Sequence, residues 1–220
     1  MNLHKDGLAT NLRKNRALLR KFFLYFFALL VGAALTGGMG FAADGVPLDF
    51  KNNGGSYDAL ASFDVAADSS VVWDVLTDYD HLTHFVTGLK RSRLEEYRGR
   101  SHFLLEQEFT GGFLFVSKRV RVRLDVHETR CQTILFEDMG HQDFAFYKGS
   151  WKIQSNSPGQ LTVLYSLSAQ QNLDEPFAGD YMKGSVQNLL DSVRREMIRR
   201  QAIKRPALAV LSKQESLVSL

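Results

Sequence analysis

Hydrophobic and polar positions alternate most clearly between residues 119 and 127. Val120, Val122, Leu124 and Val126 fall on one face of an extended chain, and mainly charged residues occupy the other face. Alternation with a period of two is typical of a strand that buries one face. Weaker alternating runs, bounded by turn-forming residues, occur on both sides of this segment. Together they predict strands over residues 57–65, 89–97, 101–110, 113–127, 131–137, 144–153 and 161–169.

Apolar residues recur at helical spacing after the first predicted strand and again near the C-terminus. Val71, Val72, Val75 and Leu76 share an apolar face, and a second short helix is predicted over residues 78–85. A longer apolar stripe predicts an amphipathic helix over residues 175–201, which Pro206 is expected to end. Short connections between strands imply an antiparallel sheet, and the long helix would cover its apolar face. We therefore predict an α+β fold: a curved antiparallel sheet of about seven strands around a long C-terminal helix, with two short helices after the first strand.

The N-terminal 43 residues differ from the rest of the chain in charge and hydropathy. Residues 1–21 carry a net charge of +5, and residues 22–43 contain no charged side chain. A basic arm, an apolar stretch and small residues at Ala42 and Ala43 are typical of a signal peptide. An uncleaved membrane anchor is the alternative, because the apolar stretch is long enough to span a bilayer. In either case we expect a bacterial protein in the periplasm, or anchored in the inner membrane and facing the periplasm.

Charge and composition from residue 44 onward narrow the possibilities further. The formal net charge of +3 for the whole chain becomes −2 once the basic arm is set aside, so nucleic acid is not a predicted partner. Residues 44–56 are polar and glycine-rich and are predicted to be a linker, residues 57–203 the folded domain, and residues 204–220 a C-terminal tail. A single cysteine excludes a disulfide framework and a multi-cysteine zinc module.

Two segments resemble the START-like (SRPBCC) superfamily, in particular its members of the polyketide cyclase/dehydrase or coenzyme Q-binding type. The first is VVWDVLTDYDHLTHFVTGLKRSRL, with Thr87 where proline is common in the family, and the second is FAFYKGSWKI. The matching positions are Trp73, Leu76, Thr77, Asp78, Tyr79, Phe85, Gly88 and Leu89, then Phe146, Gly149, Ser150 and Trp151. The resemblance covers about residues 57–200. It implies a helix-grip fold that encloses an apolar cavity, and family members bind lipids, quinones or polyketides.

Aromatic and apolar residues of the later strands and of the last helix are the candidates for a cavity lining, since ligand pockets are mainly apolar with few polar groups. Simple packing in the core is the alternative for each of them. Tyr165 and Tyr181 would each offer one hydroxyl to an oxygen of a lipid or quinone. The predicted cavity residues are Phe115, Phe144, Phe146, Trp151, Tyr165, Tyr181, Met182 and Leu189.

Polar groupings give no catalytic constellation. His81 and His84 are close in sequence but lack a third ligand at good spacing, so we predict no metal site there. Glu106 and Glu108 share a strand face and are expected to pair with the arginines of residues 119–123 rather than to act as catalytic acids. We assign no catalytic residue, no metal and no cofactor.

The sequence thus favours an exported, membrane-associated binding or carrier protein for a lipid or quinone-like molecule. Two alternatives stay open. One is a cyclase- or hydrolase-type enzyme that uses the same cavity. The other is a structural partner of a membrane complex that uses an arginine stripe, formed by Arg119, Arg121 and Arg123. The predicted partners are a hydrophobic small molecule and a membrane, and no particular protein partner is indicated.

Overall fold

The computed structural model describes residues 45–113, 116–157, 159–172 and 177–218, with side chains described for 45–110, 119–157, 159–172 and 177–204. The predicted signal peptide or anchor lies outside the described residues. The candidate Phe115 lies outside them as well.

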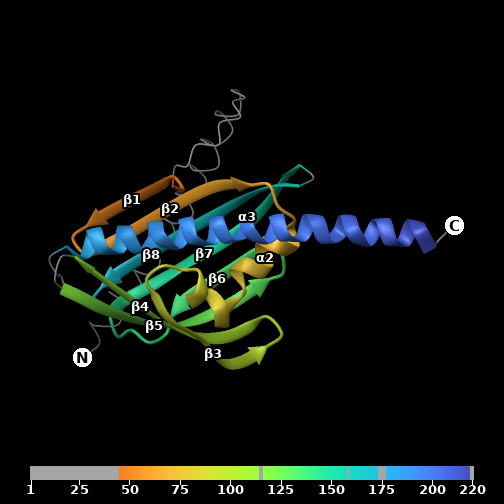
Figure 1. Ribbon diagram of the computed structural model, residues 1–220. Helices are drawn as coiled ribbons and strands as arrows, with labels where there is room; N and C mark the ends of the chain where they lie inside the picture. Colours follow the sequence, from red (N-terminus) through yellow and green to blue (C-terminus); the bar gives the residue numbers. More distant parts are fainter. Residues whose placement is uncertain (1–44, 114–115, 158, 173–176, 219–220) are drawn as a thin grey trace, which may run out of the picture. The chain divides into compact units, whose positions relative to one another are not determined.

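A single antiparallel sheet forms most of the structure, and its strands curve around the long helix (Figure 1). The order across the sheet is β1-β2-β8-β7-β6-β5-β4-β3, with every neighbouring pair antiparallel. This is the predicted sheet with eight strands in place of about seven. The strands are β1 (Leu48–Asn53), β2 (Ser56–Val65), β3 (Leu89–Gly99), β4 (His102–Phe113), β5 (Val116–Thr129), β6 (Thr133–Asp138), β7 (Phe144–Ser157) and β8 (Gln160–Gln171).

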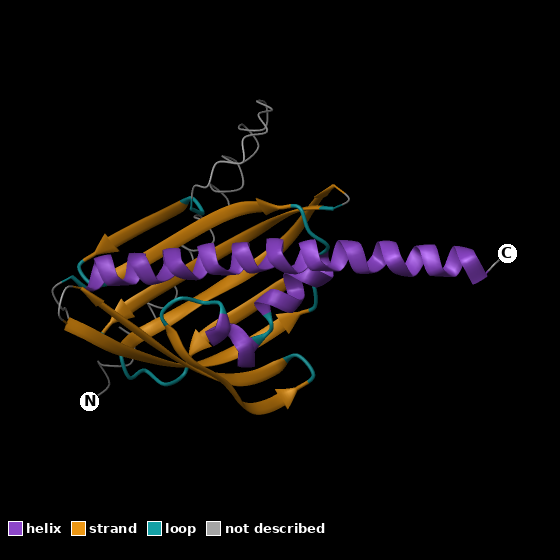
Figure 2. Ribbon diagram, in the orientation of Figure 1, coloured by secondary structure: helices purple, strands orange, loops and turns teal. Residues whose placement is uncertain are grey.

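Three described helices lie against the sheet, as predicted from the apolar spacing (Figure 2). Two short ones, α2 (Ser69–Leu76) and the 3₁₀ helix η2 (Tyr79–His84), follow β2. The long helix α3 (Ala178–Val218) lies across the concave face of the sheet. A curved sheet that grips one long helix confirms the predicted helix-grip fold.

The prediction of a linker over residues 44–56 was wrong. Residues 48–53 form β1, which pairs along its whole length with β2 at the edge of the sheet. Val46 is 2% exposed, its main-chain N–H donates to Asp191 at 2.7 Å, and its carbonyl accepts from Gln187 at 2.9 Å. An edge strand with one solvated face needs few apolar residues, so its sequence looked like a polar connection.

The predicted end of the long helix was also wrong. Helix α3 continues past Gln201 and through Pro206 to Val218, so the predicted tail of residues 204–220 is helical as far as Val218. A proline removes one main-chain hydrogen bond but does not by itself prevent the helix from resuming. The last part of α3 projects beyond the sheet (Figure 1). No helix among the described residues is both long and apolar enough to cross a membrane.

The alternating segment of β5 behaves as predicted. Val120, Val122, Leu124 and Val126 are all at most 5% exposed and face the core. On the outer face, Arg119 and Arg121 each place Nε 3.0 Å from Glu108, and Arg123 places Nε 2.6 Å from Glu95. The arginine stripe is therefore paired within the sheet, as the sequence predicted for Glu108.

Candidate functional site

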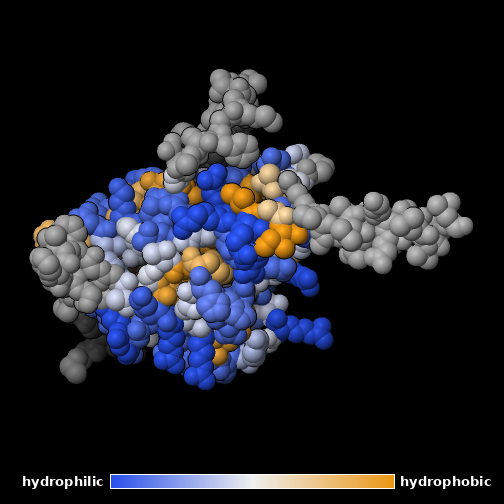
Figure 3. Space-filling view, viewed as in Figure 1, coloured by the Kyte–Doolittle hydropathy of each residue, from blue (hydrophilic) through white to orange (hydrophobic). Residues whose placement is uncertain are grey.

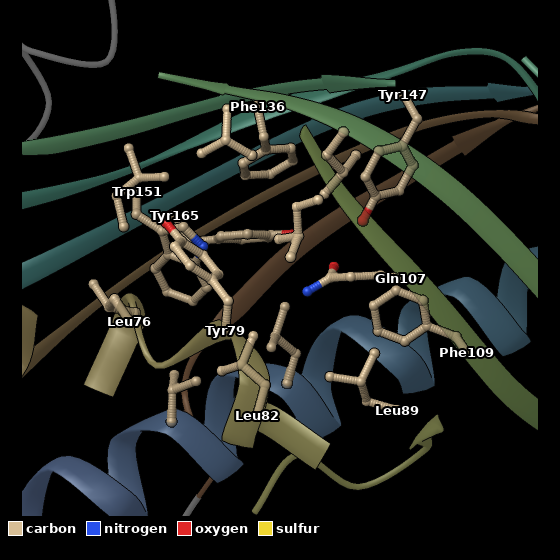
Figure 4. Close-up of a pocket in the computed structure, with 16 residues that line it drawn as sticks. Leu76, Tyr79, Leu82, Leu89, Gln107, Phe109, Phe136, Tyr147, Trp151 and Tyr165 are labelled. Atoms are coloured by element: carbon tan, nitrogen blue, oxygen red, sulfur yellow. The ribbon is translucent and has the colours of Figure 1, made fainter. Parts of the chain in front are cut away.

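Two neighbouring cavities lie between the concave face of the sheet and the helices. The larger has a volume of about 60 Å³ and the smaller about 30 Å³. Strands β4 to β8 supply the upper and right-hand walls of the larger cavity in the view of Figure 4, and α2, η2, α3 and Leu89 at the start of β3 close it from below. Its lining is Leu76, Tyr79, Leu82, Leu89, Leu105, Gln107, Phe109, Leu124, Val126, Ile134, Phe136, Tyr147, Trp151, Tyr165, Leu189 and Val193.

Four side chains line both cavities and so form the wall between them. They are Phe109 of β4, Tyr147 of β7, Tyr165 of β8 and Leu189 of α3. Each cavity is smaller than the roughly 150 Å³ that accommodates one benzene molecule in an engineered protein core. A ligand larger than a few waters must therefore displace this shared wall and join the two spaces.

Polar groups inside this apolar space are few and converge on one region. Gln107 is 9% exposed, and its amide donates to Ser92 at 3.4 Å. The polar ends of Gln107 and Tyr147 point into the same part of the cavity (Figure 4). The hydroxyls of Tyr165 and Tyr181 are buried and make no hydrogen bond of good geometry in the described part of the chain. The nearest polar groups are the hydroxyl of Tyr147 beside Tyr165 and that of Ser185 beside Tyr181.

Burial controls the protonation of these tyrosines. It raises the pKa of the Tyr165 hydroxyl well above the usual value, and the neighbouring Tyr147 adds to that rise. Burial likewise raises the pKa of Tyr147. Both hydroxyls are therefore neutral at physiological pH, and each has a proton to donate to an acceptor atom in the cavity.

Six of the predicted cavity residues line one or both of the two cavities. Trp151 lines the larger cavity, and Tyr165 and Leu189 line both cavities. The smaller cavity is also lined by Phe144, Tyr181 and Met182. Contact of any of these residues with a ligand stays a prediction.

Phe146 is the exception among the described candidates, because it lines neither cavity. A bulge shifts the pairing between Phe144 and Phe146, and from that point the alternation of β7 is reversed. Phe146 then faces Lys148, whose ammonium lies 5.9 Å from the ring centre, and Tyr147 takes the inward position. One extra residue in a strand moves every following side chain to the other face.

The inward-facing Gly149 makes room for an aromatic ring that the sequence analysis did not single out. A Cβ atom at this position would clash with the main-chain oxygen of Ser166 and would lie 2.6 Å from Cζ of Phe136. Phe136 lines the larger cavity. The glycine between Phe146 and Trp151 in the family-like segment thus has a packing reason.

The other family-like segment holds η2 in place below the cavity. The Tyr79 hydroxyl donates to Glu128 of β5 at 2.7 Å. Asp78 accepts from Arg200 of α3 at 2.6 Å, and its other oxygen lies 2.6 Å from His81. Burial acts to raise the pKa of Asp78, but the hydrogen bonds and charges of His81 and Arg200 outweigh it and lower the pKa. Asp78 and Tyr79 therefore tie η2 to the helix and to the sheet.

No carboxylate, histidine, lysine, arginine or cysteine is present in the described lining of either cavity. The titratable groups there are tyrosines, and burial raises the pKa of Tyr79, Tyr147, Tyr165 and Tyr181. Neutral tyrosines can donate hydrogen bonds and polarise a carbonyl, but they cannot accept a proton at neutral pH. The described site is therefore suited to holding a ligand.

Fold and cavity together define a helix-grip domain with an apolar interior. Residues 65–194 match the family described as polyketide cyclase/dehydrase and lipid transport, and the chain belongs to that family. The START-like assignment made from the two sequence segments is thereby confirmed. No curated protein sequence matches the chain.

Solved structures with the same fold include proteins of different activities. The Zhui aromatase/cyclase from Streptomyces sp. R1128 has a TM-score of 0.54 and 14% identity, over 66% of this chain and 95% of its own. The lipid transfer and protein localization domain of human StarD13 has a TM-score of 0.53 and 14% identity, over 79% and 95%. A STAR-related lipid transfer protein from Xanthomonas axonopodis has a TM-score of 0.51 and 12% identity, over 70% and 99%. These likenesses show the shared fold.

Proposed function

We propose that this protein is a carrier for a hydrophobic small molecule, a lipid or a quinone-like compound, held between the sheet and α3. The observation that supports this most is the buried Tyr165 hydroxyl, which faces an apolar cavity and makes no hydrogen bond of good geometry in the described chain, with only the Tyr147 hydroxyl beside it. A buried hydroxyl without a partner is unfavourable, typically by about 1–3 kcal/mol. A ligand oxygen placed there would relieve that penalty while the ligand body contacts leucine and aromatic side chains.

The family supports the same proposal, since its description includes lipid transport. Of the similar structures, one is a STAR-related lipid transfer protein, one is a lipid transfer and protein localization domain, and one is an aromatase/cyclase. A cyclase would need a group that takes up a proton near the substrate, and the described lining has only neutral tyrosines. Binding without chemistry is therefore the better-supported function. The arginine stripe, already paired with glutamates, offers little for a membrane partner.

The small size of the cavities limits the shape of the ligand that can enter them. Opening the shared wall requires rotation of Phe109, Tyr147, Tyr165 or Leu189, and Leu189 is only partly buried. A narrow chain, such as an acyl or prenyl group, displaces fewer of these side chains than a fused ring system does. We therefore propose a chain-like molecule that carries one oxygen acceptor near Tyr165.

We also propose that the protein is exported and acts at the periplasmic side of the inner membrane. The support is the basic arm followed by the uncharged residues 22–43. The described chain begins at residue 45, shortly after this segment, and the main chain of Val46 is hydrogen-bonded to α3. An uncleaved segment would keep the carrier attached to the membrane that supplies its ligand.

Fluorescence titration with cis-parinaric acid, a linear polyene fatty acid, tests the carrier proposal on the full chain in detergent. We expect saturable binding at one site, and native mass spectrometry should show a co-purifying hydrophobic molecule. Leu189→Trp fills the shared wall and should abolish binding, whereas Ile198→Trp makes a similar change on the exposed side of α3 and should not. Absence of saturable binding, or equal loss in both variants, would argue against the carrier function.

The polar end of the ligand is tested with Tyr165→Phe. Loss of one hydrogen bond of about 0.5–1.5 kcal/mol should weaken binding by roughly 2–13-fold without changing the fold. Competition with decylubiquinone separates a quinone ligand from a fatty acyl ligand. Unchanged affinity for both compounds in Tyr165→Phe would remove the proposed anchor.

Export is tested by fusing an alkaline phosphatase reporter, which is active only after export, behind residue 220. We expect phosphatase activity in a bacterial host and none when residues 1–43 are deleted. Intact mass of the purified chain then separates cleavage near Ala42 or Ala43 from retention as an anchor. An inactive fusion of the full chain would refute export.

A further inference from the structure

Two histidines and one aspartate gather on the outer face of the sheet, away from the cavities. His102 of β4 and His127 of β5 are direct cross-strand partners, and Asp125 lies two residues before His127 on the same face. His102 Nε2 is 2.6 Å from Asp125 Oδ1, and His127 Nε2 is 3.3 Å from Asp125 Oδ2. One donor atom from each residue lies within 4.8 Å of the other two.

The sheet itself holds these three side chains together. The two imidazole rings stack with centres 4.0 Å apart and an angle of 18° between their planes. The β4–β5 ladder runs unbroken from His102↔His127 to Phe113↔Val116, so the register fixes both ring positions. His102 and Asp125 are partly buried and His127 is exposed, which leaves the site open to solvent on one side.

The set of donor atoms indicates which ion would suit the site. Imidazole nitrogen is a preferred ligand of zinc and of the neighbouring transition metals, whereas magnesium and calcium prefer sites made only of oxygen. Three protein ligands with an open fourth position are a common arrangement for Zn²⁺, with ligand distances of about 2.0–2.2 Å. Small movements of these three side chains would bring the donor atoms to those distances.

One cation near the three residues competes with a metal ion for the carboxylate of Asp125. Arg98 is the competing cation, with Nη1 3.6 Å from Asp125 Oδ1. The Arg98 side chain is 38% exposed and also lies 3.6 Å from Glu96, so it can move aside toward that glutamate.

We propose that His102, Asp125 and His127 form a binding site for one divalent transition-metal ion, with Zn²⁺ as the best fit. The ion would tie the end of β4 to β5 on the outer face of the sheet. It would not contact a ligand in the cavity, because none of the three residues lines either cavity. The sequence analysis predicted no metal, and these three residues come together only in the folded sheet.

Isothermal titration of the full chain in detergent, without a polyhistidine tag, tests the site with ZnCl₂ in the presence of millimolar Mg²⁺. We expect one Zn²⁺ per chain and a rise in Tm on addition of the metal. His102→Gln combined with His127→Gln should weaken binding by about tenfold or more, and Asp125→Asn should weaken it as well. Circular dichroism confirms that each variant is folded.

The second histidine pair of the fold provides a matched control. His81 and His84 lie with ring centres 5.4 Å apart on η2, and His81 is paired with Asp78. His81→Gln combined with His84→Gln removes the same number of imidazoles and should leave Zn²⁺ affinity unchanged. Arg98→Gln should tighten binding, because it removes the competing charge. Equal losses in the two histidine pairs, weaker binding in Arg98→Gln, or only unsaturable binding would overturn the proposal.

Discussion

Replacing Glu196 tests how α3 is held against the rest of the domain, because Glu196 and Asp78 bind the same arginine, Arg200. Its side chain is 8% exposed, and its carboxylate accepts hydrogen bonds from Arg199 at 2.6 and 2.7 Å and from Arg200 at 2.7 Å. Arg200 also donates a hydrogen bond to Asp78, the residue just before η2. The hydrogen bonds from Arg199, followed by those from Arg200, lower the pKa of Glu196 from 4.5 to about 2, although burial acts against them. Replacement by glutamine removes the charge and keeps the shape.

The size of the effect follows from the linkage between protonation and folding. The pKa of Glu196 is lower in the folded chain than in the unfolded chain, where it is near 4.5. Its ionised form therefore stabilises the fold at any pH above about 4.5. That stability is lost as the pH falls toward 2. The shift corresponds to about 3 kcal/mol as an upper limit, and because Arg199 is 60% exposed we expect about 2–3 kcal/mol. More than half of it should be gone by pH 3.

Urea unfolding of wild type and Glu196→Gln between pH 7 and pH 3 measures this contribution. The variant should be less stable by about 2–3 kcal/mol at pH 7, and the two curves should converge as the pH falls. Glu137→Gln on the exposed side of β6 controls for the substitution itself and should change stability by less than about 0.5 kcal/mol. A Glu196→Gln deficit that is absent at pH 7, or that is the same at pH 3, would refute the reasoning.

Three further substitutions test the packing of the cavity and core. Gly149→Ala should lower Tm by about 6–12 °C, because the new Cβ would clash with Ser166 and Phe136; an unchanged melting curve would contradict this. Tyr165→Phe should leave the free energy of unfolding unchanged or raise it by up to about 1 kcal/mol in urea titrations, and a clear loss would show that the hydroxyl has a partner. Leu190→Ala should lower the free energy of unfolding by about 3–5 kcal/mol, since Leu190 is fully buried; a loss below about 1 kcal/mol in the same assay is incompatible with that burial.

The surface of α3 shows where the sequence pattern was ambiguous. Met182, Val186, Leu190, Val193 and Met197 are buried as the apolar stripe predicts. The helix nevertheless runs beyond the sheet, and hydrophobic areas lie on the helix side of an otherwise hydrophilic surface (Figure 3). Apolar residues of α3 that are at least half exposed include Ile198 and Ile203. Where a helix ends depends on a balance between local propensity and packing that a single proline does not decide.

The two glycines of α3 illustrate the same limit. From the sequence alone, a glycine at position 179 or 184 can either allow a close approach of helix and sheet or leave room for a ligand. A Cβ at Gly179 would clash with the side chain of Asn52 on β1, so this glycine permits close approach. Gly184 faces open space within 4 Å and has no such role in the described structure. The residue type was the same, and only the packing partner separated the two cases.

The sequence by itself determined the fold class and the family, and it named a minority of the residues that line the two cavities. Period-two and helical spacing are local patterns, so they can be read from the sequence alone. The side chains of Asp78 and Tyr79 in the family-like segment make folding contacts to Arg200 and Glu128. The tertiary structure alone decided three features. The bulge in β7 exchanged Phe146 for Tyr147 in the cavity, the pairing with β2 made residues 48–53 a strand, and the β4–β5 register brought His102 to Asp125 and His127. Each depends on which residues face one another across strands, and strand register is set by contacts between segments distant in sequence.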